Sequence, residues 1–186
     1  MILPIYIFGQ NVLRKVAQDI PADFPDLPQL IDDMFDTLAE SEGIGLAAPQ
    51  VGKDIRVVVI DLDVLGEDYP EYKGYRKAFI NPHIVEYDES ETDTMEEGCL
   101  SLPGIHEKVT RPTRIHVTYE DADRNPRDEW VDGYLARVMQ HEFDHLEGKV
   151  FIDRISPFRK TMIKSKVKAL LQGRYQCGYR TKAAVK

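Results

Sequence analysis

Two histidines, His141 and His145, stand four residues apart, with Glu142 directly after the first. Inside a helix, residues four apart lie on one face, so both imidazoles can bind the same metal ion. Glu142 lies about 100° around the helix axis from His141, beside such an ion and within reach of a water, which suits a general base. The structural alternative is a pair of histidines hydrogen-bonded at the edge of a core. The pattern alone names neither a metal nor a substrate.

A third protein ligand must come from elsewhere in the chain. A typical H-E-x-x-H peptidase takes it from a downstream Glu or His, but Glu147 lies on the wrong side of the helix. Cys99, in the segment Glu97-Gly-Cys-Leu-Ser, is the natural candidate because a thiolate is a strong ligand for Fe(II) or Zn(II). The alternative for Cys99 is a small buried side chain that only packs.

A third segment, Gly43-Ile-Gly-Leu-Ala-Ala-Pro-Gln-Val-Gly, is rich in small residues. Its glycines and alanines allow the chain to approach another backbone closely. The spacing differs from that of a G-x-G-x-x-G phosphate loop. Gln50 supplies a neutral donor that could face a carbonyl oxygen, whereas from this segment alone an ordinary loop glutamine is the simpler interpretation.

Several elements must position these residues. Apolar residues between 27 and 38 recur with helical spacing, and we expect this helix to end near Glu42 and Gly43, where glycine can take a left-handed conformation. We predict strands within 54–62, 78–80, 83–87, 105–110, 114–120 and 126–131, with a break at Asn81-Pro82. Helices are expected over 133–147 and after Ser156-Pro157. This order predicts an α+β fold, with mainly antiparallel sheets around a central metal-binding helix and an amphipathic C-terminal helix.

The composition predicts an ordinary globular domain. The chain has 186 residues, 42% of them hydrophobic and 30% charged, and no apolar run approaches the roughly 18 residues of a membrane span. Without a secretory signal pattern at the N-terminus, we expect a cytoplasmic protein, in which a disulfide between Cys99 and Cys177 is disfavoured. Residues 154–186 hold ten Lys or Arg and no acid, whereas residues 1–153 hold 14 basic and 32 acidic residues. A basic end can attract a polyanion, although a solvated helix face explains it as well.

Taken together, three segments resemble the motifs of peptide deformylases, in the same order. They are residues 43–50, Glu97-Gly-Cys-Leu-Ser and Gln140-His-Glu-Phe-Asp-His. The resemblance covers about residues 1–172 and implies a catalytic domain there, with residues 173–186 as a basic, flexible tail. It implies removal of the N-formyl group from the initiator methionine of nascent proteins. Residues 61–75 look like a longer loop than the family's shorter members carry.

The resemblance also implies residue roles. Cys99, His141 and His145 hold one divalent metal ion with a water at the fourth position. Glu142 takes a proton from that water and delivers it to the leaving amine. The side chain of Gln50 and the backbone N–H of Leu100 stabilise the oxyanion. The native metal is expected to be Fe(II), with Zn(II), Ni(II) or Co(II) also compatible with one sulfur and two imidazoles.

Substrate recognition follows from the same resemblance. An extended formylmethionyl peptide would bond to the backbone near Ile44, Gly45 and Gly98. The implied substrate-binding residues are Ile44, Gly45, Met95, Glu97, Gly98, Tyr134 and Val138, of which Ile44, Met95, Tyr134 and Val138 would form an apolar methionine pocket. Glu97 is also expected to pair with Arg111 and so fix the Cys99 loop. The C-terminal helix could contact ribosomal RNA, and neither DNA nor a membrane is expected as a partner.

Two other classes remain open from the sequence. A zinc endopeptidase would require a correctly placed downstream ligand. A structural metal site in an RNA- or ribosome-binding module would take all four ligands from protein. Glu142 beside an open coordination position favours an enzyme over the second class.

Overall fold

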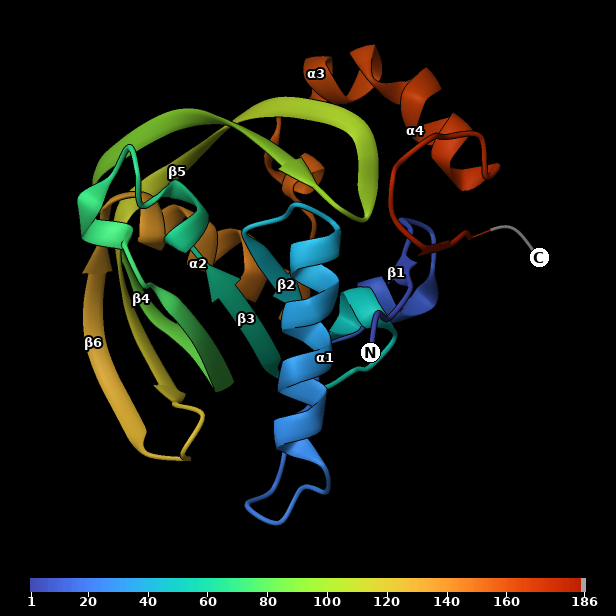
Figure 1. Ribbon diagram of the computed structural model, residues 1–186. Helices are drawn as coiled ribbons and strands as arrows, with labels where there is room; N and C mark the ends of the chain where they lie inside the picture. The colour runs from blue at the N-terminus through green and yellow to red at the C-terminus, as the bar shows by residue number, and fades with distance from the viewer. Residues whose placement is uncertain (185–186) are drawn as a thin grey trace.

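A five-stranded antiparallel sheet and two helices packed on it form the centre of the protein (Figure 1). The computed structural model describes residues 1–184. The sheet order is β2-β3-β4-β5-β6, built from β2 (Gly45–Ala47), β3 (Val57–Asp61), β4 (Arg76–Cys99), β5 (Leu102–Glu120) and β6 (Pro126–Asp132). The main helices are α1 (Leu27–Glu40) and α2 (Gly133–Leu146). The expected α+β class with a mainly antiparallel sheet around a central helix is confirmed.

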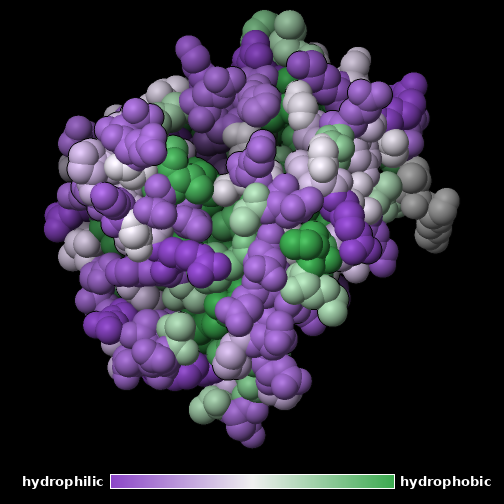
Figure 2. Space-filling view, in the orientation of Figure 1, coloured by the Kyte–Doolittle hydropathy of each residue, from purple (hydrophilic) through white to green (hydrophobic). Residues whose placement is uncertain are grey.

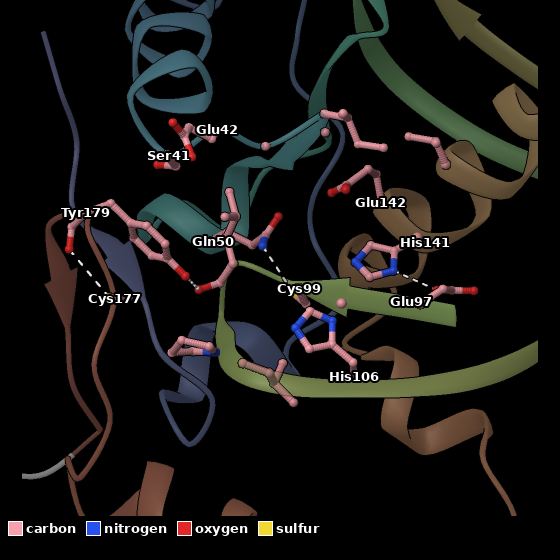
Figure 3. Close-up of a pocket in the computed structure, with 18 of the residues that line it drawn as sticks. Ser41, Glu42, Gln50, Glu97, Cys99, His106, His141, Glu142, Cys177 and Tyr179 are labelled. Atoms are coloured by element: carbon pink, nitrogen blue, oxygen red, sulfur yellow. Dashed lines mark hydrogen bonds and ion pairs between the residues drawn. The ribbon is translucent and has the colours of Figure 1, made fainter. Parts of the chain in front are cut away.

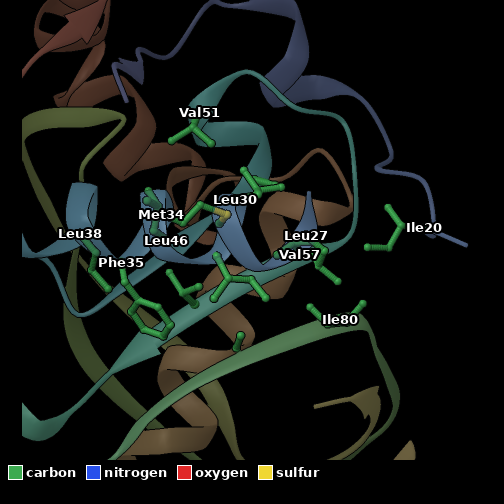
Figure 4. Packing of buried hydrophobic residues seen from close by; sticks show 14 of the residues in the cluster. Ile20, Leu27, Leu30, Met34, Phe35, Leu38, Leu46, Val51, Val57 and Ile80 are labelled. Carbon is green, nitrogen blue, oxygen red and sulfur yellow. The ribbon is translucent and has the colours of Figure 1, made fainter. Parts of the chain in front are cut away.

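Strand β3 explains how the sheet separates two cores. Its side chains alternate, so that Val57 and Val59 enter one hydrophobic cluster and Val58 and Ile60 enter the other. Helix α1 packs its apolar face on the first cluster (Figure 4). Helix α2 packs on the second cluster with the face that includes Phe143. The predicted strand within 54–62 is therefore present and is buried on both faces.

The end of α1 differs from our expectation in one detail. Glu42, with φ of 54°, takes the left-handed conformation, and Gly43 does not. Glycine is required at 43 for another reason: a Cβ there would lie 2.8 Å from Leu38 and 2.9 Å from Leu100. Glycine at residue 43 therefore allows α1 and the turn that carries Leu100 to lie close together.

Strands β4 and β5 form one long hairpin where we expected several short strands. The expected break at Asn81-Pro82 is a register shift between Ile80 and His83, and the pairing then continues to Cys99. Residues 89–96 lie in β4 although all of them are exposed, so no buried alternation marks this part in the sequence. Cys99 pairs with Leu102, which leaves Leu100 and Ser101 as the turn of the hairpin.

The C-terminal helix is divided in two, α3 (Pro157–Met162) and α4 (Lys164–Leu171). Ser156 caps α3 by accepting a hydrogen bond from the backbone N–H of Arg159, as predicted. The expected apolar face is only partly covered, because Ile163 and Leu170 are buried whereas Phe158 is 69% exposed. Short 3-10 helices, η1 to η5, occupy 11–14, 48–51, 63–65, 70–72 and 151–154.

The structure differs most from our expectation in the tail. We expected residues 173–186 to be flexible, but residues 173–184 run back along the body. Within them, β7 (Thr181–Lys182) pairs in parallel with β1 (Ile5–Tyr6) near the N-terminus. Residues 185–186 of the expected tail lie outside the described residues. Throughout residues 1–184, every helix is too short or too polar to cross a membrane.

Candidate metal centre and active site

Three potential metal ligands converge from two elements. Cys99 stands at the end of β4, and α2 presents His141 and His145 on one face. Their ligand atoms all lie within 4.8 Å of one another, and the Cys99 sulfur lies 3.4 Å from Nε2 of His145. Ligand atoms that share one tetrahedral ion at ordinary bond lengths are about 3.3–3.6 Å apart. The residues present therefore fit one divalent metal ion.

Glu97 fixes the outer side of His141. Its carboxylate accepts hydrogen bonds from Arg111 at 2.6 and 2.9 Å and from Nη1 of Arg137 at 2.7 Å. It also lies 2.8 Å from Nδ1 of His141, which leaves Nε2 of that ring for a metal. The predicted pair between Glu97 and Arg111 is thus present in the structure. Hydrogen bonds from Arg111 and His141 outweigh the burial of Glu97 and lower its pKa well below the usual value.

The two histidines favour a thiolate at Cys99. Burial raises the pKa of this thiol, but the charge of His145 and hydrogen bonds from His141 and His145 outweigh burial and lower the pKa to about 5. Burial lowers the pKa of His141, whereas hydrogen bonds with Cys99 and Glu97 hold it above its usual value. A metal cation bound at this place would replace the proton that Cys99 and His141 share.

Glu142 is buried beside this cluster, and its Oε2 has no hydrogen-bond partner among the described residues. Burial raises the pKa of Glu142. Burying a carboxylate oxygen without a hydrogen-bond partner costs free energy, unless a water or a ligand donates the missing hydrogen bond. Gly45 makes room for Glu142, because a Cβ at residue 45 would lie 2.6 Å from Oε1 of Glu142. This contact explains one of the glycines in the segment around residues 43–50.

Gln50 lies on the short helix η2 (Ala48–Val51) and reaches the same cluster from the opposite side. Its Oε1 accepts a hydrogen bond from the backbone N–H of Ala47, which fixes the orientation of the amide. Its Nε2 then points to the hairpin turn, at 3.5 Å from the Cys99 sulfur and 3.2 Å from Oγ of Ser101. Figure 3 shows Gln50 and Glu142 on the two sides of Cys99.

A cavity of about 650 Å³ opens over these residues. Of the predicted substrate-binding residues, Ile44, Gly45, Glu97, Gly98, Tyr134 and Val138 line it. Met95, on β4, does not belong to this lining: it pairs with Val109 of β5 and is 36% exposed. Much of the molecular face seen in Figure 2 is hydrophilic, with apolar residues in small separate areas.

The structure adds residues that sequence reasoning missed. Arg137 lines the cavity, is buried, and donates to Glu97 and to the carbonyl of Val109. Its position four residues before His141 on the same helix was the available signal. Residues 176–179 of the C-terminal segment also line the cavity, and no pattern in their sequence indicates this. Both cysteines are free, in agreement with the expectation that they form no disulfide.

An α+β fold with a Cys/His/His cluster beside a buried glutamate, whose Oε2 has no partner among the described residues, has the features of a metal-dependent hydrolase. Comparison with known proteins narrows this class. The model of the polypeptide deformylase family matches residues 2–161. The chain is 40% identical to the peptide deformylase of Flavobacterium psychrophilum, covering 100% of this chain and 99% of that one. It is 41% identical to the enzyme of Cytophaga hutchinsonii, with complete coverage of both chains.

Solved structures agree with this match. The crystal structure of peptide deformylase from Thermotoga maritima superposes with a TM-score of 0.75 at 42% identity, covering 84% of this chain and 99% of that chain. A structure of Arabidopsis thaliana peptide deformylase 1B gives a TM-score of 0.82 at 32% identity, covering 92% and 91%. The chain belongs to the peptide deformylase family, whose metal-dependent hydrolases remove the N-formyl group from nascent peptides. This activity was predicted from the sequence motifs and is confirmed.

Proposed function

We propose that Cys99, His141 and His145 hold one divalent metal ion and that Glu142 is the general base and acid of the deformylation. The observation that carries this proposal is Oε2 of Glu142, buried without a partner next to three convergent ligand atoms. A divalent ion bound there lowers the pKa of a water and polarises the formyl oxygen. Glu142 accepts the proton that the attacking water loses, and then donates a proton to the amine nitrogen as formate leaves.

Two donors stabilise the oxyanion that develops on the formyl oxygen. Gln50 is suited to this role because the Ala47 N–H holds its amide with Nε2 toward the ligand cluster. The 3.5 Å contact of Nε2 with the Cys99 sulfur is weak because sulfur is a poor acceptor, and a substrate oxygen can replace it. The backbone N–H of Leu100, in the hairpin turn that follows Cys99, is the second donor. Each such donor lowers the barrier by about 2.7–4 kcal/mol in other hydrolases.

The formylmethionyl peptide binds in extended form. Strand β2 stands at the end of the sheet order, so its outer edge can add a peptide strand beside Gly45. Ile44, Tyr134 and Val138 form the wall of the methionine pocket on the side of α2. Glu97 acts through His141 and does not contact the substrate, because its oxygens are already used by Arg111, Arg137 and His141.

Formate release from formyl-Met-Ala-Ser tests this assignment. Glu142→Gln should reduce kcat by about 10²–10⁴-fold, the usual contribution of general acid–base catalysis. Glu147→Gln is the matched control, because Glu147 lies on the surface after the same helix and pairs with Arg56. Wild-type kcat in Glu142→Gln would exclude the proposed base.

We propose Fe(II) as the native metal, since one thiolate and two imidazoles suit it and an open position remains for chemistry. Metal analysis of protein purified without oxygen tests this identity. Activity should decay in air, and a Ni(II)-loaded sample should decay more slowly. Equal rates of decay in both samples would argue against iron.

We further propose that residues 1–172 form the catalytic domain that holds the metal ligands, the general base and the oxyanion donors, in the cytoplasm where nascent chains are made. We also propose that the basic surface of α3 and α4 contacts the ribosome. Lys164, Lys166 and Lys168 are exposed on α4, whereas Arg159 is paired with Glu107. Clusters of exposed lysines favour contact with RNA phosphates. Replacing the three lysines by Gln should weaken salt-sensitive ribosome binding, and unchanged binding would refute the contact.

A further inference from the structure

The C-terminal segment reaches the active site from the side opposite α2. Gln176, Cys177, Gly178 and Tyr179 line the catalytic cavity together with residues of β4 and α2. Figure 3 shows Tyr179 separated from Glu142 by Gln50 and Cys99. The family model ends at residue 161, so this wall lies outside the part of the chain that the family model describes.

Hydrogen bonds hold the chain just before and just after the segment 176–179. Before it, the Tyr175 hydroxyl lies 2.8 Å from Oγ1 of Thr181. After it, the carbonyl of Arg180 accepts a hydrogen bond from the N–H of Ile5 at 2.9 Å. The carbonyl of Lys182 likewise accepts one from the N–H of Ile7 at 3.0 Å. The N-terminal strand therefore fixes the position of the wall.

Tyr179 makes the one hydrogen bond between this wall and the turn that follows Cys99. Its hydroxyl donates to the carbonyl of Leu100 at 2.7 Å, and its half-buried ring packs on the same core cluster as the Leu100 side chain. Packing of a half-buried tyrosine ring does not by itself require a hydrogen bond to the protein, because water can reach its hydroxyl. The bond instead satisfies a carbonyl of a two-residue turn.

Three contacts from separate elements hold this turn. Tyr179 holds the Leu100 carbonyl, the N–H of Phe8 donates to the Ser101 carbonyl at 2.9 Å, and Gln50 donates to the Ser101 hydroxyl at 3.2 Å. The turn begins at Cys99 and contains the backbone N–H that we assign to the oxyanion. Small displacements of such a donor reduce its effect in the transition state more than they reduce substrate binding.

We propose that the segment 176–179 is a functional part of the active site and that Tyr179 is a positioning residue, which holds the Leu100–Ser101 turn in its reactive geometry. This inference rests on the proposed role of the Leu100 N–H. We expect the effect in kcat and not in KM, because the turn acts on the oxyanion, whereas the methionine pocket lies on the side of α2. The other tyrosine of the segment, Tyr175, bonds within the tail and does not line the cavity.

The test compares two full-length variants with the same chemical change, Tyr179→Phe and Tyr175→Phe. Kinetics with formyl-Met-Ala-Ser are measured together with the melting temperature, at equal folded fraction by circular dichroism. For Tyr179→Phe we expect kcat to fall about three- to tenfold, the effect of one hydrogen bond, with KM changed by less than about twofold. For Tyr175→Phe we expect a similar change in melting temperature and kcat within about twofold of wild type.

The outcomes distinguish a failure of this inference from a failure of the proposed catalytic assignment on which it rests. Equal kcat values in the two variants would overturn the role of Tyr179, whether both are lowered or both are unchanged. A rise in KM alone would also overturn it, because the segment would then act in substrate binding and not on the turn. Inactive wild-type protein, or active Glu142→Gln, would instead refute the proposed catalytic assignment.

Discussion

Replacing Glu97 by Gln tests the buried charge network that supports the metal ligands. The substitution keeps the size and shape of the side chain and removes one negative charge. In the structure the Glu97 carboxylate accepts two hydrogen bonds from Arg111, one from Arg137 and one from His141. The glutamine would keep one acceptor oxygen and turn an NH₂ group toward N–H donors.

The expected loss of stability follows from these contacts. Breaking a buried ion pair by removal of one partner costs about 3–5 kcal/mol. Arg111 keeps a second anion, because its Nη1 lies 2.9 Å from Asp144. We therefore expect the lower end, about 3 kcal/mol, which corresponds to about 6–12 °C in Tm for a chain of this length. Because Glu97 also orients His141, metal affinity should fall about 10- to 100-fold.

Urea unfolding and competition with a chelator measure the two effects. The control is Glu96→Gln, the same change at the neighbouring, exposed residue, which should alter stability by no more than about 0.5 kcal/mol. The reasoning is refuted if the two variants unfold at the same urea concentration, or if they bind metal equally well.

Three further predictions concern catalysis and the C-terminal helices. Gln50→Ala should lower kcat for formyl-Met-Ala-Ser about 10²–10³-fold with little change in KM, and a change in KM alone would exclude the oxyanion role. Gly45→Ala should lower kcat because the added methyl group would displace Glu142, and full activity would show that this contact is not needed. Arg159 lowers the pKa of Glu107 through a hydrogen bond, so this pair stabilises the fold above the ordinary glutamate pKa of about 4.3 and stops doing so as pH falls through the lowered pKa. Urea unfolding between pH 7 and 3 should therefore show a larger loss for wild type than for Glu107→Gln, and parallel curves would contradict the pair.

The two main helices and the face that His141 and His145 share were predictable because their signals are local. The spacing of His141 and His145 within an amphipathic pattern determines both the helix and the face on which the rings lie. Cys99 was a candidate from its chemistry, and only the family resemblance assigned it as a ligand, because its distance from the histidines in sequence gives no geometry. The structure brings all three together through the hairpin end of β4.

Other features depend on contacts that no local pattern reveals. Residues 89–96 continue β4, and residues 92–96 pair with β5. Because all the side chains of residues 89–96 are exposed, neither periodicity nor hydrophobicity marks them. Tyr179 reaches the active site only because Thr181 pairs with Ile5, about the whole length of the chain away. Met95 was expected in the methionine pocket from the family resemblance, and it is absent from the cavity lining although Glu97, on the same face of β4, belongs to it.

X-ray absorption on zinc-loaded protein tests the central claim most directly. With Cys99, His141 and His145 as ligands, the spectrum should show one sulfur at about 2.3 Å and two nitrogens at about 2.0–2.1 Å, and Cys99→Ser should remove the sulfur. A wild-type spectrum with only nitrogen and oxygen ligands would contradict the proposed centre.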